Sequence, residues 1–226
     1  SQAISVSLYG RLNYDLAKDL APVIQAVNYT NLLVVHPSLP VKTVQDLIAL
    51  AKVKPAQLNY GTAGNGTPPH IAGEMFKSMA GVNIVHVPYK NAAPALIDVV
   101  GGQVQMMFAG AGAAVPHMQS GRLRALAVTS AEPSTLVPDL PTVAAAGLPG
   151  YESVAMTAMF APAKTPDAIL RRLNAEINVA LKKPEVRERF LSQGTEAMGG
   201  TPEQLTAVMK NEIERLNKII KNTGLQ

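Results

Sequence analysis

The chain contains no cysteine and no tryptophan, and aromatic residues make up only 4% of its 226 positions. Without cysteine there is no disulfide bond, no thiolate ligand for a metal ion and no cysteine nucleophile. Proteins that bind nucleic acids usually combine clustered basic residues with aromatic side chains that stack on bases. Here the net charge is only +4 and the 20 basic residues form no run. The composition therefore argues against nucleic acid as a partner.

The sequence also lacks any apolar run of about 18 residues, the length that a membrane-spanning helix needs. No signal peptide precedes Ser1, and the first residues show no clear start of a helix or strand, which we interpret as a chain without its natural beginning. Apolar residues at 47% and charged residues at 16% are typical of a globular protein. The 17 prolines and 17 glycines are spread along the chain, which indicates many short elements joined by tight turns.

Short apolar segments alternate with helical segments through the middle of the chain, a rhythm typical of the α/β class. Strands separated by helices of about ten residues favour a parallel sheet with right-handed crossovers. An irregular proline-rich connection at 136–151 ends the rhythm, and amphipathic helices follow it, opened by Thr165 and Thr201. We expect strands at 32–36, 57–61, 84–89, 104–108, 123–129 and 154–160, and helices at 43–53, 67–80, 94–100 and 113–119.

A glycine-rich turn between the strand at 57–61 and the helix at 67–80 is the segment most informative about function. The first turn of a helix presents N–H groups and a positive dipole end to anions, and glycine lets the backbone approach a ligand. The alternative is an ordinary turn in which Thr67 caps the helix. The spacing matches neither a Walker loop nor the dinucleotide-binding fingerprint, so we predict no cofactor here. The candidate ligand contacts are Thr62, Gly64, Asn65, Gly66 and Thr67.

A second candidate is the loop after the strand at 84–89, where Tyr89 and Lys90 precede the helix at 94–100. Tyr89 offers a hydroxyl and a ring face, and Lys90 offers a charge near an anion. The alternative is a tyrosine packed on the neighbouring turn and a solvated lysine.

The histidines and carboxylates show no spacing that indicates a metal site or a catalytic centre. No histidine pairs with another at i+3 or i+4, and we interpret His86 as an ordinary strand residue between two valines. No Gly-x-Ser-x-Gly motif is present, so we predict no catalytic residue. A hydrolase that uses the 62–67 turn as an anion hole stays an alternative, which requires a hydroxyl within reach of His70 or His117.

Several moderately specific segments, in this order and spacing, make the chain similar to one known family over nearly its whole length. It resembles the Bug-type solute-binding receptors of tripartite tricarboxylate transporters. The segments that carry the resemblance are Val34–Pro40, Leu58–Thr67, His70–Phe76, His86–Lys90, Ala95–Val104, Gly121–Ser130, Pro138–Val143 and Ala146–Tyr151.

The resemblance implies a type II periplasmic binding-protein fold, in which two lobes, each with a mostly parallel sheet flanked by helices, close on a ligand. The complete lobe is expected at 31–151. The other lobe, 1–30 with 152–226, is expected to be incomplete, because the family has further N-terminal βα units that this sequence lacks. The crossing segments are expected near 25–30 and 152–157.

The resemblance also implies a function without catalysis or cofactor. It predicts a periplasmic receptor that captures a small organic carboxylate and delivers it to the membrane permease subunits of a transporter. A sensor module for a signalling partner is the alternative, since its fold would be identical. By position, the resemblance places ligand contacts at Gly64–Thr67 and in the Tyr89 loop, and Ser1 falls where the family has a ligand-side loop. Ala109 stands where members commonly have Asp, which favours a plain dicarboxylate or aromatic acid over an amino acid.

Overall fold

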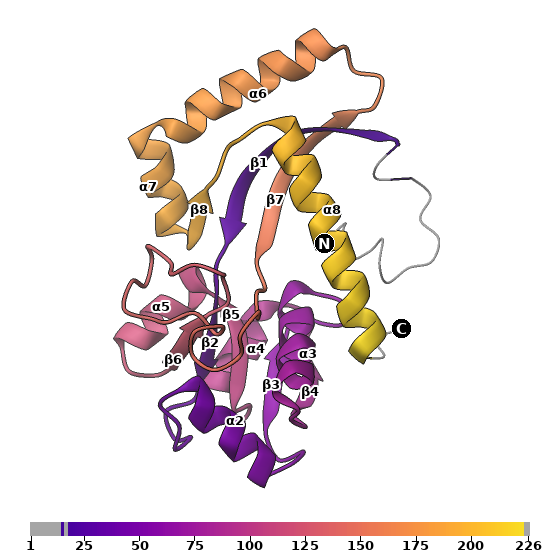
Figure 1. Ribbon diagram of the computed structural model, residues 1–226. Coiled ribbons are helices and arrows are strands. Elements are labelled where there is room, and N and C mark those ends of the chain that lie inside the picture. Colours follow the sequence, from indigo (N-terminus) through magenta and orange to yellow (C-terminus); the bar gives the residue numbers. More distant parts are fainter. Residues whose placement is uncertain (1–14, 16–17, 224–226) are drawn as a thin grey trace. The chain divides into compact units, whose positions relative to one another are not determined.

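The structure is a computed structural model that describes residue 15 and residues 18–223, with side chains as far as residue 220 (Figure 1). Ser1, one of the expected ligand contacts, lies outside the described residues. The chain divides into two compact units: unit 1 comprises Ser1–Tyr29 with Ala155–Gln226, and unit 2 comprises Thr30–Val154. Among the residues that the structure describes, no helix combines the length and apolarity needed to cross a membrane.

Unit 2 is a five-stranded sheet with the strand order β4-β3-β5-β2-β6. Strand β3 pairs in parallel with β4 and β5, whereas β2 is antiparallel to β5 and β6. The strands and helices expected in this part of the chain are confirmed, with ends that shift by a few residues. In chain order they are β2 (Asn31–Val35), α2 (Val44–Val53), β3 (Asn59–Thr62), α3 (Pro68–Ala80), β4 (Val85–Pro88), α4 (Ala92–Val100), β5 (Met106–Gly110), α5 (Ala111–Gln119) and β6 (Arg124–Val128).

Local sequence signals begin and end the helices of unit 2. Thr43 and Asp46 form a capping box at the start of α2, in which each side chain accepts the other residue's main-chain N–H. Prolines fill the first two positions of α3, and Gly81 ends that helix in the left-handed conformation with φ 62°. Every residue of β2 is buried, as expected for a strand with neighbours on both edges and helices around it.

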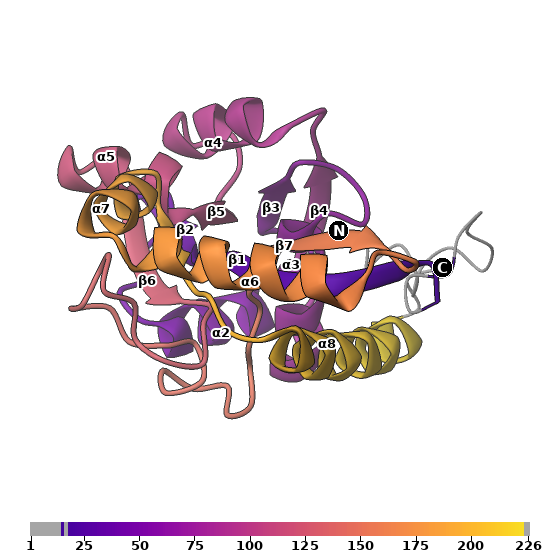
Figure 2. The same cartoon turned by 90° about the horizontal axis from the view of Figure 1, so that it is seen from above.

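Unit 1 contains a three-stranded sheet with the order β7-β1-β8, and β1 is antiparallel to both neighbours. Helix α6 packs on β1: Leu181 joins the apolar cluster of Val23 and Ile24, and the Asn174 side chain donates to the Val23 carbonyl (2.8 Å). Figure 2, which is turned by 90° about the horizontal axis from Figure 1, shows α6 lying over β1. The elements are β1 (Leu20–Tyr29), β7 (Ala155–Pro162), α6 (Asp167–Lys182), α7 (Pro184–Ser192), β8 (Thr195–Ala197) and α8 (Pro202–Thr223).

The mostly parallel sheet that we expected in the first lobe is wrong for the described residues of unit 1. Strands β7 and β8 run in the same direction and are linked by helices, but β1 lies between them and runs the opposite way. Unit 2 repeats this arrangement with β5, α5 and β6 around the antiparallel β2. The alternation along the sequence reveals the strands that a helix joins, but not a third strand inserted between them. Strands β1 and β8 themselves were not predicted.

Helix α3 packs closely on β3 at Gly73, where the missing side chain leaves room for the ring of Tyr60. Tyr60 is 1% exposed. A Cβ atom at position 73 would overlap Cε2 of the ring and would lie 2.7 Å from its Cζ atom. The glycine therefore sets how near the helix approaches the strand.

We expect Gly73→Ala to lower the free energy of unfolding by about 1–3 kcal/mol, because the added Cβ would displace the buried Tyr60 ring in a closely packed interior. Alanine in an open helix position would instead stabilise by about 1 kcal/mol. Urea unfolding followed by circular dichroism measures the difference. Gly110→Ala is the control, since nothing lies within 4 Å of its added Cβ. Equal effects of the two substitutions would contradict the close packing.

Candidate functional site

The glycine-rich loop, residues 62–67, connects the end of β3 to the start of α3. Gly64 and Gly66 have φ angles of 113° and 71°, a region that favours glycine. A Cβ atom on Gly64 would lie 3.3 Å from the main-chain oxygen of Tyr89. Asn65, between the two glycines, is exposed. The two glycines thus allow a tight turn that presents Asn65 to solvent.

Hydrogen bonds within the glycine-rich loop hold its shape. The N–H of Gly64 donates to Oγ1 of Thr62 (3.1 Å), and the hydroxyl of Thr67 donates to the carbonyl of Gly64 (2.7 Å). The N–H of Tyr89 donates to the carbonyl of Thr62 (3.0 Å), which ties the loop to the end of β4. Thr67 occupies the N-cap position of α3, but its side chain makes no capping bond to the helix. The hydroxyl of Thr67 therefore stabilises the loop rather than the helix.

The start of α3 offers fewer N–H groups to an anion than its position alone suggests. Pro68 and Pro69, in the first turn, have no N–H to donate. The N–H of Gly66 donates to Nδ1 of His70 (3.0 Å), and that of Gly64 is also used within the loop. Among the residues that the structure describes, the main-chain N–H and the side-chain amide of Asn65 make no hydrogen bond to another residue. Asn65 is thus the main polar group that this loop offers to a ligand.

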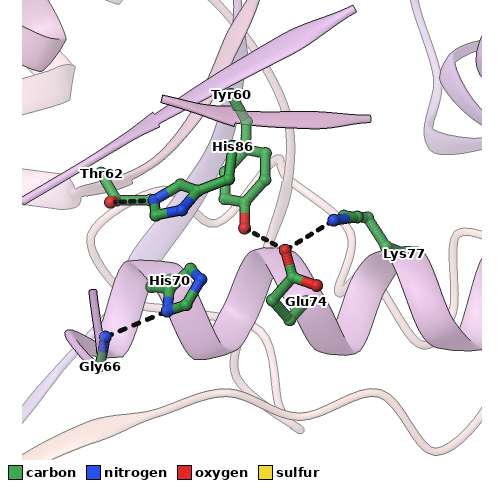
Figure 3. Close-up of polar contacts among 7 residues, drawn as sticks. All are labelled: Tyr60, Thr62, Gly66, His70, Glu74, Lys77 and His86. Carbon is green, nitrogen blue, oxygen red and sulfur yellow. Dashed lines mark hydrogen bonds and ion pairs between the residues drawn. The ribbon is translucent and has the colours of Figure 1, made fainter. Parts of the chain in front are cut away.

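Two stacked histidines lie directly behind the glycine-rich loop (Figure 3). The rings of His70 and His86 have centroids 4.1 Å apart and planes inclined by 23°. Nε2 of His86 lies 2.6 Å from Oγ1 of Thr62, and Nδ1 of His70 accepts the Gly66 N–H. The stacked pair therefore contacts the loop at both of its ends.

A buried carboxylate extends this group of side chains along α3 (Figure 3). Tyr60 stacks on His86 with ring centroids 5.0 Å apart, and its hydroxyl donates to Oε1 of Glu74 (2.6 Å). Lys77 donates to the same oxygen (2.7 Å). A buried carboxylate is costly unless it is paired and hydrogen-bonded, and Glu74 is only 9% exposed. We refer to Tyr60, His70, Glu74, Lys77 and His86 as the histidine–carboxylate cluster.

Both histidines of the cluster are held in the neutral form near pH 7. Burial lowers the pKa of His86 to about 4, with the neighbouring His70 adding to the effect. Burial also lowers the pKa of His70, partly opposed by the charge of Glu74. Two imidazolium charges about 4 Å apart would repel by about 4 kcal/mol at an effective dielectric constant of 20. Because Nδ1 of His70 accepts a hydrogen bond from Gly66, its proton is on Nε2.

The hydroxyl of Tyr89 is occupied by a neighbouring carboxylate. It donates to Oδ2 of Asp98 in α4 (2.6 Å). Burial, together with this carboxylate, raises the pKa of Tyr89 to about 12. Tyr89 is half-buried and Lys90 is exposed. The tyrosine therefore anchors its loop to α4, and its role in ligand binding stays a prediction.

Ala109 lies inside the core of unit 2. It is 1% exposed, pairs with Leu32 across β5 and β2, and packs in an apolar cluster with Ala111 and Val128. The next residue along β5, Gly110, is exposed. The position thus supplies no polar group, and contact of Ala109 with a ligand stays a prediction.

The described part of the chain contains no group of three or more side chains suited to hold a metal ion. Thr62 and His86 form a hydroxyl–imidazole contact of the kind that hydrolases use. However, the side chain of Thr62 is fully buried and its oxygen accepts the Gly64 N–H, so a substrate has no access to it. Within the described residues, no hydroxyl is hydrogen-bonded to the ring of His70 or His117, which the hydrolase alternative requires.

The sequence did not predict the histidine–carboxylate cluster, because its histidines lie far apart in the chain and show no i+3 or i+4 spacing. His86 is a strand residue, as predicted, and it lies beside Tyr60 in the parallel register of β3 and β4. His70 is in the first turn of the helix that joins these strands. The β3–α3–β4 order was the feature of the sequence that could have indicated the cluster. In such a unit the start of the connecting helix lies close to the ends of the two strands that it links.

The comparisons with known proteins match the chain over nearly its whole length. The model of the tripartite tricarboxylate transporter receptor family matches residues 1–225. A UPF0065 protein from the tcbD-tcbE intergenic region of Pseudomonas sp. (strain P51) is 38% identical over 213 residues, which are 94% of this chain and 63% of that protein. Protein BugT of Bordetella pertussis is 33% identical over 98% of this chain and 68% of its own length. The chain thus spans about two thirds of the length of these relatives.

Solved structures of similar sequence have the same fold. Rpa4515 of R. palustris with adipate has a TM-score of 0.85 and 38% identity, over 96% of this chain and 73% of that one. MatC of Rhodopseudomonas palustris with bound malate has a TM-score of 0.81 and 30% identity, over 96% and 75%. The periplasmic binding protein BugD has a TM-score of 0.84 and 28% identity, over 99% and 76%.

We expect the free energy of unfolding to decrease as the pH falls from about 6.5 towards 4. His86 takes up a proton at its ordinary pKa of 6.5 in the unfolded chain but only at about 4 in the folded protein. In this window the unfolded state binds more protons, so acid favours it. Urea unfolding at several pH values measures the slope.

His86→Gln should make this slope shallower, because it removes a group that titrates differently in the two states. His36→Gln, which removes a histidine outside the cluster, is the variant for comparison. A slope that is the same in wild type and in the His86 variant would contradict a neutral, buried His86.

Proposed function

Because the chain belongs to the tripartite tricarboxylate transporter receptor family, we propose that it is an extracytoplasmic receptor that binds a small organic carboxylate. The observation that carries the proposal is the pair of solved relatives, at 38% and 30% identity, that contain adipate and malate. Both molecules are dicarboxylates of short carbon chain. In the periplasm, the receptor binds its ligand without changing it chemically. It then delivers the ligand to the membrane permease subunits of a tripartite transporter.

The proposed contact with one ligand carboxylate is the glycine-rich loop of unit 2. The exposed side-chain amide and the main-chain N–H of Asn65 are donors that a carboxylate can accept, and the hydrogen bonds of Thr62 and Thr67 hold the turn that presents them. The positive end of the α3 dipole adds a favourable field. A preformed loop loses little conformational entropy when an anion binds.

The proposed ligand has no amino group. An α-amino group of a ligand needs an anionic partner, and Ala109 supplies none at the position where family members commonly have Asp. A dicarboxylate such as adipate satisfies its charged ends with N–H and amide donors alone. Calorimetric detection of tight aspartate or glutamate binding would contradict this part of the proposal.

We expect the chain to bind adipate or malate in isothermal titration calorimetry and not to bind hexane-1,6-diol, which has the carbon chain of adipate without its charges.

Asn65→Ala should weaken dicarboxylate binding about tenfold or more, because a hydrogen bond to a charged group contributes about 1.5–3 kcal/mol. Melting of the free protein should stay nearly unchanged, since Asn65 is exposed.

The matched control is Asn83→Ala, an exposed asparagine at the other end of α3, which should leave affinity unaltered. An Asn65→Ala variant with wild-type affinity would place the site elsewhere. Failure of wild type to bind either dicarboxylate would contradict the function itself.

A further inference from the structure

The glycine-rich loop makes two hydrogen bonds to titratable side chains, one between Thr62 and His86 and one between Gly66 and His70. The Gly66 N–H donates to Nδ1 of His70 (3.0 Å). The remaining anchors of the loop, from the Gly64 N–H, the Thr67 hydroxyl and the Tyr89 N–H, join hydroxyl and main-chain groups that do not titrate in the physiological range. His70 is 6% exposed, so water competes little for this bond. The main-chain orientation of Gly66, next to the exposed Asn65, is therefore tied to one buried imidazole nitrogen.

His86 supports His70 from the opposite side. Its ring stacks on that of His70 at 4.1 Å, and its Nε2 atom lies 2.6 Å from the Thr62 hydroxyl. The Thr62 oxygen in turn accepts the N–H of Gly64. The stacked rings thus hold Gly66 directly and Gly64 through Thr62, on the two sides of Asn65. Figure 3 shows the contacts of Thr62 and Gly66 with the two rings.

The charged and titratable groups around the pair come from the same three elements. Glu74 and Lys77 of α3 face both rings with opposite effects on their protonation, and Tyr60 of β3 stacks on His86 of β4. Glu74 is itself bound by Tyr60 and Lys77 through one oxygen. The carboxylate that could stabilise a charged imidazole is therefore already neutralised by its own partners.

We propose that His70, supported by His86, is a positioning residue that holds the glycine-rich loop in its ligand-binding shape and releases it when Nδ1 is protonated. A proton on Nδ1 turns the acceptor into a donor, so that two N–H groups face each other and the bond to Gly66 is lost. Asn65 then loses its fixed orientation and carboxylate affinity falls. The ligand part of this inference rests on the proposed function, whereas the hydrogen bond to Gly66 does not.

The first experiment requires no ligand. The amide signal of Gly66 is followed by ¹H–¹⁵N nuclear magnetic resonance between pH 7.5 and 4.5 in wild type, His70→Asn and His70→Phe. Asparagine places an oxygen near the position of Nδ1 that accepts a hydrogen bond and does not titrate. We expect the wild-type signal to move with acid, the His70→Asn signal to stay constant, and the His70→Phe signal to be shifted at every pH.

A wild-type Gly66 signal that is constant over this range, or one that His70→Phe leaves unmoved, would overturn the proposal. If His70→Phe does not fold, the comparison of wild type with His70→Asn still decides it. His36→Asn is the matched control, because His36 also accepts a nearby main-chain N–H, that of Ser38 (3.3 Å), but lies outside the cluster.

The second experiment measures adipate affinity by calorimetry over the same range of pH. At pH 7.5, His70→Phe should weaken binding tenfold or more, and His70→Asn should stay within about twofold of wild type. Towards pH 5, the adipate affinity of wild type should fall relative to that of His70→Asn. Protonation of adipate itself affects both proteins equally, so it cancels from the ratio of the two affinities.

A His70→Phe variant with wild-type affinity, or a ratio of affinities that does not change with pH, would overturn the coupling to binding. Absence of adipate binding in wild type would contradict the proposed function, while the Gly66 signal still tests the role of His70.

Discussion

The packing of α3 against β3 and β4 depends on the burial of Glu74, and the arrangement of the glycine-rich loop follows from it. A carboxylate at 9% exposure is tolerated because Tyr60 and Lys77 both bind its Oε1 atom. Tyr60 reaches that oxygen because Gly73 leaves room for its ring. One turn of helix thus fixes the distance between α3 and the sheet, and with it the position of His70 behind the loop.

The same arrangement of strands occurs in both units, and one continuous segment of the chain supplies the inserted antiparallel strand of each. In each unit a strand lies antiparallel between two strands that share a direction and are linked by helices. The two inserted strands, β1 and β2, are separated by Thr30 alone. No helix lies between β1 and β2, so the two are joined without the helical crossover that links parallel strands.

The glycine-rich loop differs in its chemistry from a simple helix N-terminus that binds an anion. Two prolines remove N–H groups from the first turn, and Gly64 and Gly66 direct theirs to Thr62 and His70. These bonds give a rigid loop that leaves few donors for a ligand. As the proposed ligand contact, such a loop would favour selectivity, because a ligand would have to match the few groups of Asn65 rather than be any anion attracted by a dipole.

The sequence by itself determined the helices and strands of unit 2, the capping of α2 by Thr43, the prolines that begin α3 and the glycines of the loop. These features depend on neighbours within a few residues, which local periodicity and backbone preference reveal. Only the tertiary structure decided the direction of β1 and β2, the turn of the Thr67 hydroxyl into the loop, and the stacking of His70 on His86. Those contacts join residues far apart in the chain, so strand register and the approach of α3 to the sheet, not local preference, bring them together.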